Sequence, residues 1–128
     1  MKYLGIDWGE KRIGLALADE ETRLALPFKT VAGPGEIKRL IDQEKIDVLV
    51  LGKPLKLSGQ GELNPAWQSF KEILVKEINL PLILIDERLS SQGADALFGS
   101  KNDKASRDEI AAAIILQEYL DKDSLLAG

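Results

Sequence analysis

The feature that most constrains the fold is an almost unbroken apolar run at residues 46–52, IDVLVLG. Such a run, without strict polar alternation, is typical of a strand buried on both faces of a sheet. Apolar residues recur at helical spacing on both sides of it, from residue 36 to about 44 and over 65–78, and a second apolar run, LPLILID, follows at 80–86. The order strand, helix, strand predicts a parallel sheet with crossover helices.

Three strand-like runs occupy the N-terminal part of the chain, at residues 2–7, 12–18 and 23–31. Gly9 and the acidic turn at 19–21 separate them, which predicts an antiparallel meander. A short helix is expected near 91–98 and a final helix over 107–120. We therefore expect an α/β fold with a five-stranded mixed sheet in the order 3-2-1-4-5 and helices on both faces.

Composition restricts the chemistry more than any motif does. The chain has 128 residues, 45% of them hydrophobic, which predicts one folded domain over 1–128. It contains no cysteine and no histidine, so thiol nucleophiles, imidazole bases and the usual zinc sites are excluded. The net charge of −4 argues against coating nucleic acid over the whole surface. The start MKYLGID carries no signal peptide, so we expect a soluble cytoplasmic protein.

Acidic residues stand at the ends of three predicted elements. Asp7 closes the first strand, Asp86 and Glu87 close the fifth, and Asp108 and Glu109 open the last helix. If the first, fourth and fifth strands are parallel, their ends share one edge of the sheet, where open α/β sheets place ligands. Carboxylates alone favour Mg²⁺ or Mn²⁺, and such ions support phosphodiester hydrolysis without histidine or cysteine.

Each of these acids also has a purely structural interpretation. Asp7 could belong only to a hairpin turn, and Asp86 or Glu87 could be a solvated strand end. The sequence from Ser106 to Glu109 fits a capping box at a helix N-terminus. We assign Glu109 to the cap, which leaves Asp108 as the candidate ligand.

Basic residues fall on the loops predicted at the same edge, where they could hold phosphates; ordinary solvation of these loops is the alternative. The candidates for nucleic-acid binding are Lys11, Arg12, Lys53, Arg88 and Lys104. Trp67 and Phe70 lie at helical spacing and are expected in the core, whereas the role of Trp8 is left open.

Four segments, GIDWGEKRIGLALAD, VLVLGKPL, ILIDERLSS and RDEIAAAIILQEYLD, together resemble the YqgF or RuvX family of nucleases. The resemblance implies a ribonuclease H-like fold, with Asp7, Glu87 and Asp108 as catalytic, metal-binding acids. It also implies processing of the 5′ end of pre-16S rRNA, while some members are described as Holliday-junction resolvases. Lys53 stands where the family usually has an apolar residue.

The sequence thus predicts a nuclease dependent on Mg²⁺ or Mn²⁺ that acts on nucleic acid. Structured or single-stranded RNA is the preferred substrate, cut by a monomer, and a four-way DNA junction is the alternative. A non-catalytic RNA-binding module and a nucleotide-binding phosphotransferase are further alternatives. The phosphotransferase is disfavoured because such enzymes need two lobes.

Overall fold

The computed structural model describes residues 1–54, 64–86 and 107–127. Its strands are β1 (Lys2–Asp7), β2 (Ile13–Asp19), β3 (Leu26–Val31), β4 (Val48–Lys53) and β5 (Leu82–Asp86). Its helices are α1 (Pro34–Glu44), α2 (Pro65–Glu77) and α4 (Arg107–Ala127). The helix expected near residues 91–98 lies outside the described residues.

The five strands form one mixed sheet in the order β3-β2-β1-β4-β5, as predicted. The β1–β2 and β2–β3 pairs are antiparallel, and the β1–β4 and β4–β5 pairs are parallel. The carboxyl ends of β1, β4 and β5 therefore lie at one edge of the sheet. The sequence predicts the active site at this edge, which is called the catalytic edge below.

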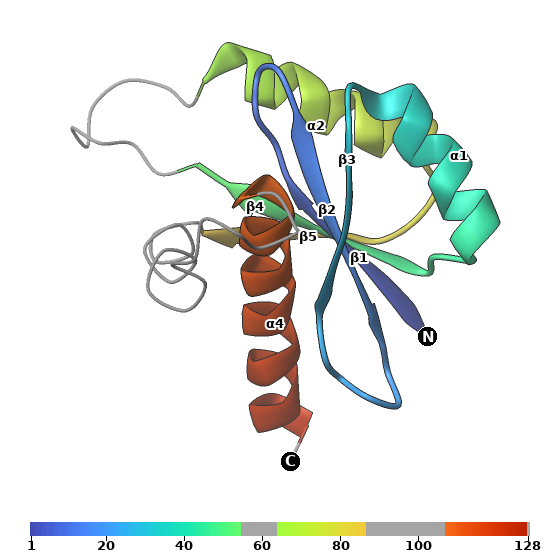
Figure 1. The fold of residues 1–128 in the computed structure, drawn as a ribbon, viewed down its shortest axis with the longest axis vertical. Helices are drawn as coiled ribbons and strands as arrows, with labels where there is room; N and C mark the ends of the chain where they lie inside the picture. The colour runs from blue at the N-terminus through green and yellow to red at the C-terminus, as the bar shows by residue number, and fades with distance from the viewer. Residues whose placement is uncertain (55–63, 87–106, 128) are drawn as a thin grey trace.

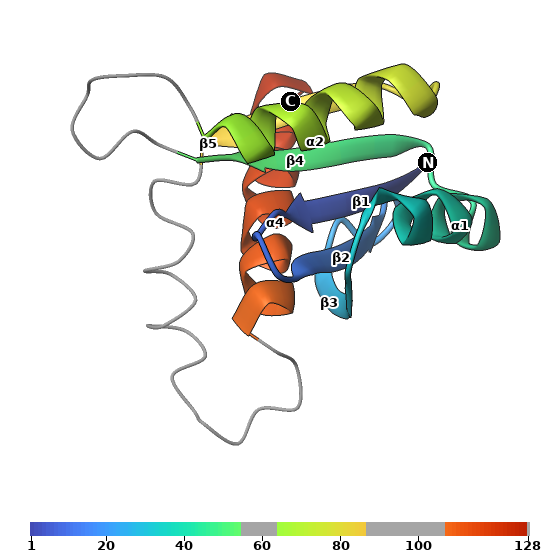
Figure 2. The ribbon, with the colours of Figure 1, turned by 90° about the horizontal axis from the view of Figure 1, so that it is seen from above.

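Helices cover both faces of the sheet (Figure 1). The core clusters to which the β1 side chains belong show which face each helix covers. Leu4 and Ile6 belong to the core cluster formed with α1 and α2, whereas Tyr3 belongs to the cluster formed with α4. In Figure 2, α2 lies in front of β4 and α4 behind it. We call these two sides the α2 face and the α4 face.

On the α2 face, Trp67 anchors its helix to the end of β4. The indole of Trp67 is 1% exposed, and its Nε1–H donates to the carbonyl oxygen of Gly52 at 3.0 Å. Phe70 is buried in the same cluster, so both aromatic residues are core residues as predicted. The hydrogen bond to Gly52 satisfies the indole N–H of Trp67, which would be costly to bury without an acceptor.

On the α4 face, the helix lies unusually close to the central strands. A Cβ atom on Gly5 would lie 2.8 Å from both the carbonyl oxygen of Ala112 and Cβ of Leu116, so only glycine fits there.

Helix α4 runs seven residues beyond the predicted end at residue 120. The sequence after Leu120 has no glycine or proline before Gly128, and such residues are the usual signals for a helix end. None of the described helices is long and apolar enough to cross a membrane.

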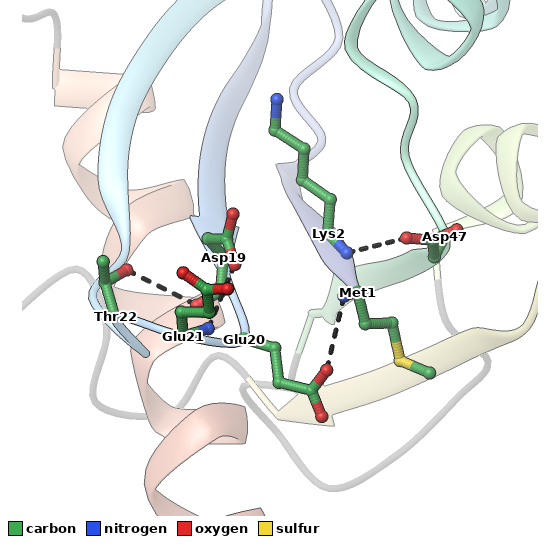
Figure 3. Close-up of polar contacts among 7 residues, drawn as sticks. All are labelled: Met1, Lys2, Asp19, Glu20, Glu21, Thr22 and Asp47. Atoms are coloured by element: carbon green, nitrogen blue, oxygen red, sulfur yellow. Dashed lines mark hydrogen bonds and ion pairs between the residues drawn. The ribbon is translucent and has the colours of Figure 1, made fainter.

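The far end of the sheet, opposite the catalytic edge, is held by polar contacts (Figure 3). The backbone N–H of Lys2 donates to Oδ2 of Asp47 at 2.8 Å, and the N–H of Asp47 donates to the carbonyl oxygen of Lys2 at 2.8 Å. The terminal amino group of Met1 forms an ion pair with Glu20 at 3.3 Å. These contacts fix the start of β1 relative to its two neighbouring strands.

β3 and β4 begin later than predicted for a shared reason, and β5 begins at Leu82 instead of residue 80. Lys45 has a φ of 58° and caps α1 in the left-handed conformation, so β4 begins at Val48 instead of residue 46. Arg23 has a φ of 51°, and its N–H donates to the carbonyl oxygen of Asp19 at 2.8 Å, so β3 begins at Leu26 instead of residue 23. A residue in the left-handed conformation interrupts an extended strand. When that residue is not glycine, the sequence gives no clear signal of the left-handed conformation.

Candidate active site

Asp7 is the last residue of β1 and is half-buried at the catalytic edge. Tyr3 packs on the α4 face, and alternation along the strand places Gly5 and then Asp7 on the same face. The carboxylate of Asp7 therefore belongs to the α4 face of the sheet. The acid is part of a strand and is not merely a turn residue.

Gly14 connects Asp7 to the start of α4. In the antiparallel β1–β2 pair, Gly14 lies directly opposite Asp7, and residues paired in this way have Cα atoms about 4.5–5.5 Å apart. A Cβ atom built on Gly14 would overlap the backbone carbonyl of Asp108. The helix backbone at Asp108 thus lies against the strand residue beside Asp7, and the two predicted acids are neighbours.

Asp108 is the second residue of α4, and its side chain is 32% exposed. A carboxylate in the first turn is favoured by the helix dipole, whatever else it does. The Nε atom of Arg12 lies 3.5 Å from Oδ2 of Asp108, and the Arg12 side chain is 70% exposed. Arg12, expected to contact nucleic acid, therefore stands directly beside a candidate metal ligand.

Glu109 makes a contact that the sequence did not reveal. Its Oε2 accepts a hydrogen bond from the Thr30 hydroxyl at 2.8 Å, which ties the first turn of α4 to β3. Ser106, the other member of the predicted capping box, lies outside the described residues. The Thr30 contact gives Glu109 a structural role and leaves Asp108 as the candidate ligand at this helix end.

At the end of β5, alternation separates the two candidate acids. Ile83 and Ile85 pack in the cluster with α4, so Asp86, the next residue, lies on the α2 face. Asp86 is exposed there and pairs in register with Lys53 of β4. Asp86 thus lies on the opposite face from Asp7, while Glu87 lies outside the described residues.

The predicted nucleic-acid contacts are only partly described. Lys11 and Arg12 are exposed in the β1–β2 connection. Lys53, expected in a loop, is the last residue of β4 and lies on the α2 face with Asp86. Arg88 and Lys104 lie outside the described residues.

Trp8, whose role the sequence left open, packs toward α2. Its ring centroid lies 6.5 Å from that of Phe70, with the ring planes inclined by 36°. It is partly buried against the core cluster on the α2 face. Because Trp8 follows Asp7 directly, this packing holds the end of β1 in place.

The site as described has two carboxylates on one face, whose oxygen atoms fit a hard divalent cation. Within residues 1–54, 64–86 and 107–127, no group of three acidic side chains is close enough to hold a metal ion. The third acid implied by the sequence, Glu87, is not among these residues. Asp7 and Asp108 are suited to bind Mg²⁺ or Mn²⁺, and the exposed Arg12 beside them is suited to bind a phosphate.

Gly14 is the site residue that sequence reasoning missed. Its signal was present, because an isolated glycine inside a strand pattern indicates close approach of another backbone. The sequence does not say which backbone approaches, since Gly14 and Asp108 are far apart in the chain. The fold supplies that information.

Comparisons with known proteins identify the family of this chain. The family model described as "RuvX: Holliday junction resolvase" matches residues 1–122. A Chloroflexus aggregans protein is 38% identical over 92% of this chain and 92% of its own length, and a Geobacillus protein is 35% identical over 94% and 98%. Both are named "Putative pre-16S rRNA nuclease".

Solved structures establish the fold. T. thermophilus RuvC, solved in complex with a Holliday junction substrate, superposes with a TM-score of 0.63 at 15% identity, covering 97% of this chain and 96% of RuvC. The fowlpox virus Holliday junction resolvase gives a TM-score of 0.58 at 19% identity, covering 95% and 99%. The predicted ribonuclease H-like fold is confirmed, and the chain belongs to the RuvX family.

Proposed function

We propose that this chain is a divalent-metal-dependent endonuclease that processes the 5′ end of pre-16S rRNA in the cytoplasm. The observation that carries the proposal is the packing of Asp108 against Gly14, directly opposite Asp7. It brings two carboxylates from distant parts of the chain to one edge of a ribonuclease H-like sheet. The names of the curated relatives support the choice of rRNA as substrate.

The chain's own residues have distinct tasks in this reaction. Asp7 and Asp108 hold Mg²⁺ or Mn²⁺, and Glu87 is proposed as the third ligand because Asp86 lies on the other face. A divalent cation held by these acids would supply activation of a water molecule and neutralisation of charge on the leaving oxygen. Arg12 offers a guanidinium for the substrate phosphate, and Gly14 keeps the two acids in place.

Resolution of a four-way DNA junction is the second candidate, favoured by the description of the matching family. Two coordinated nicks on symmetric strands are most simply made by a two-fold dimer with two sites. We propose a monomer that cuts one strand at a time, so rRNA processing is preferred. The ribonuclease H-like fold by itself does not choose between the two substrates.

One assay separates these functions. The pure protein is incubated at equal concentrations with an RNA spanning the 5′ end of pre-16S rRNA and with a four-way DNA junction, in Mg²⁺, Mn²⁺ or EDTA. We expect cleavage of the RNA with either metal and none in EDTA, from a protein that light scattering shows to be monomeric. Symmetric paired nicks in the junction by a dimer would establish the resolvase, and binding without cleavage would establish an RNA-binding module.

A further inference from the structure

A groove of about 190 Å³ lies between the edge strand β3 and helix α1. Its lining residues are Lys29, Val31, Glu36, Arg39, Leu40 and Gln43. It is smaller than the pockets of about 300–1,000 Å³ that enclose whole small molecules. Its size suits a phosphate group and its sugar, with the rest of a longer ligand outside.

The groove lies on the α2 face, because Val31 and Leu40 belong to the core cluster there, so it is on the opposite face of the sheet from Asp7 and Asp108. β3 runs in the same direction as β1, because both are antiparallel to β2. Val31, which lines the groove and is the last residue of β3, pairs with Ile13, the residue after Arg12. Asp7 and β3 are two strand spacings apart, which is about 10 Å. From Arg12, which pairs with Asp108 on the α4 face, a strand of nucleic acid would reach this groove by passing over the catalytic edge to the α2 face.

Two basic side chains give the groove its positive charge, although the whole chain carries −4. Lys29 and Arg39 come from different elements, and both are exposed. Lys38, the neighbour of Arg39, instead forms an ion pair with Glu77 of α2 at 3.6 Å. The two adjacent basic residues of α1 thus serve different surfaces, and Arg39 is the one that lines this groove.

Glu36, the acidic residue that lines the groove, stabilises the adjacent backbone. Oε1 of Glu36 accepts the backbone N–H of Ala32 at 3.2 Å, which stabilises the connection between β3 and α1. Lys29 by itself could be explained as a charge that protects an edge strand from pairing with another chain. That explanation does not account for Arg39, which lies on a helix.

We propose that the groove between β3 and α1 binds backbone phosphates of the substrate strand beyond the catalytic edge, through Lys29 and Arg39. The proposal rests on the proposed nuclease function and adds a path for the substrate. A basic groove that follows a phosphate backbone is a common device for holding a single strand. The ligand is a phosphodiester chain, and RNA is the form expected here.

The test is a binding measurement in EDTA, which separates binding from cleavage. Affinity for a fluorescein-labelled single-stranded RNA of about 20 nucleotides, longer than the site of one such groove, is measured by anisotropy across a salt series. The double variant Lys29→Ala/Arg39→Ala should flatten the plot of log affinity against log salt by about 1.4, at about 0.7 per phosphate on a single strand. At 0.1 M salt this corresponds to a loss of roughly tenfold or more.

Lys38→Ala is the matched control, because it removes one positive charge from the same helix but outside the groove. It should leave the affinity within about twofold, the scale of a remote exposed charge. Glu36→Gln is expected to change the RNA affinity in the opposite direction. The amide oxygen still accepts the Ala32 N–H, but the negative charge is gone, so RNA should bind more tightly. Circular dichroism checks that each variant is folded.

Unchanged affinity and salt slope in the folded double variant would overturn the proposal, as would an equal loss in Lys38→Ala. The same labelled strand made as DNA shows whether the groove distinguishes the two sugars or reads phosphate alone. Failure of the nuclease function would look different. In that case the metal-dependent cleavage assay is negative, while the loss of binding in the double variant persists.

Discussion

The backbone of Asp108 at the start of α4 packs directly against Gly14, the second residue of β2, which is the middle strand of the antiparallel meander. The contact leaves no room for a Cβ atom on the strand residue. Because Gly14 is also the register partner of Asp7, this one residue contacts both the start of α4 and the end of β1. Stability and activity should therefore both depend on it.

Gly14→Ala should push the first turn of α4 away from the sheet. Overpacking of this kind costs about 1–3 kcal/mol of unfolding free energy, and the shift of Asp108 should lower cleavage further than the stability loss explains. Urea denaturation and a cleavage assay on the folded fraction measure the two effects. Gly35→Ala is the control, since a Cβ there meets no atom within 4 Å. A fully active Gly14→Ala variant would contradict the role of this contact.

Asp7→Asn should abolish cleavage and leave the fold intact. The amide keeps the shape of the side chain but loses the charge that holds a divalent cation. We expect a fall of more than about 100-fold, the upper range for residues that only orient metal ligands. Asp86→Asn is the matched variant on the other face of the sheet and should retain activity. If Asp86→Asn is the inactive one, the assignment of faces at the end of β5 is wrong.

Asp108→Asn and Glu109→Gln should differ in activity although the residues are adjacent. Asp108→Asn should stop cleavage while changing stability by only about 1 kcal/mol, the scale of a first-turn charge. Glu109→Gln keeps an oxygen that can accept the Thr30 hydroxyl, so it should retain activity and stability. Cleavage rates with Mn²⁺ and thermal unfolding of both variants provide the comparison. The reverse pattern of activity would make Glu109 the ligand.

Trp67→Phe should destabilise the fold without touching the acids. It removes the indole N–H and leaves the buried carbonyl of Gly52 without this donor, which costs about 1–3 kcal/mol. Val75→Ala, at an exposed position of the same helix, should change stability by less than about 0.5 kcal/mol. Urea denaturation measures both. Equal stability of the Trp67 variant and the parent would show that the bond contributes nothing.

The order of the strands and helices could be predicted because the apolar pattern follows the sheet and helix periods. The run at 46–52 is apolar because its side chains meet α2 on one face and α4 on the other. Element ends were less predictable. The left-handed Lys45 and the long-range pairing of Asp47 with Lys2 decide where β4 begins, and neither has a local signature in the sequence.

The candidate site was predicted from the positions of its acids at element ends, and its detailed contacts were not. Arg12 is predicted to bind phosphate, and its ion pair with Asp108 at 3.5 Å was not predicted. The bond from Thr30 to Glu109 joins residues 79 apart in the chain. Contacts of this kind depend on which helix end meets which strand. Only the assembled sheet specifies that.

Lys53→Ala should weaken RNA binding more than it slows the chemical step. Lys53 ends β4 at the catalytic edge, between the strands that carry Asp7 and Asp86, but its side chain lies on the α2 face. It can therefore hold a phosphate near the site without reaching the cation. Loss of one phosphate contact should lower the salt slope of RNA binding by about 0.7.

Anisotropy in EDTA measures the effect of Lys53→Ala on binding, and single-turnover cleavage at saturating enzyme measures its effect on the chemical step. Lys76→Ala, an exposed lysine in the last turn of α2, is the control. A Lys53 variant with normal affinity but slow single-turnover cleavage would move Lys53 from the substrate path to the reaction itself.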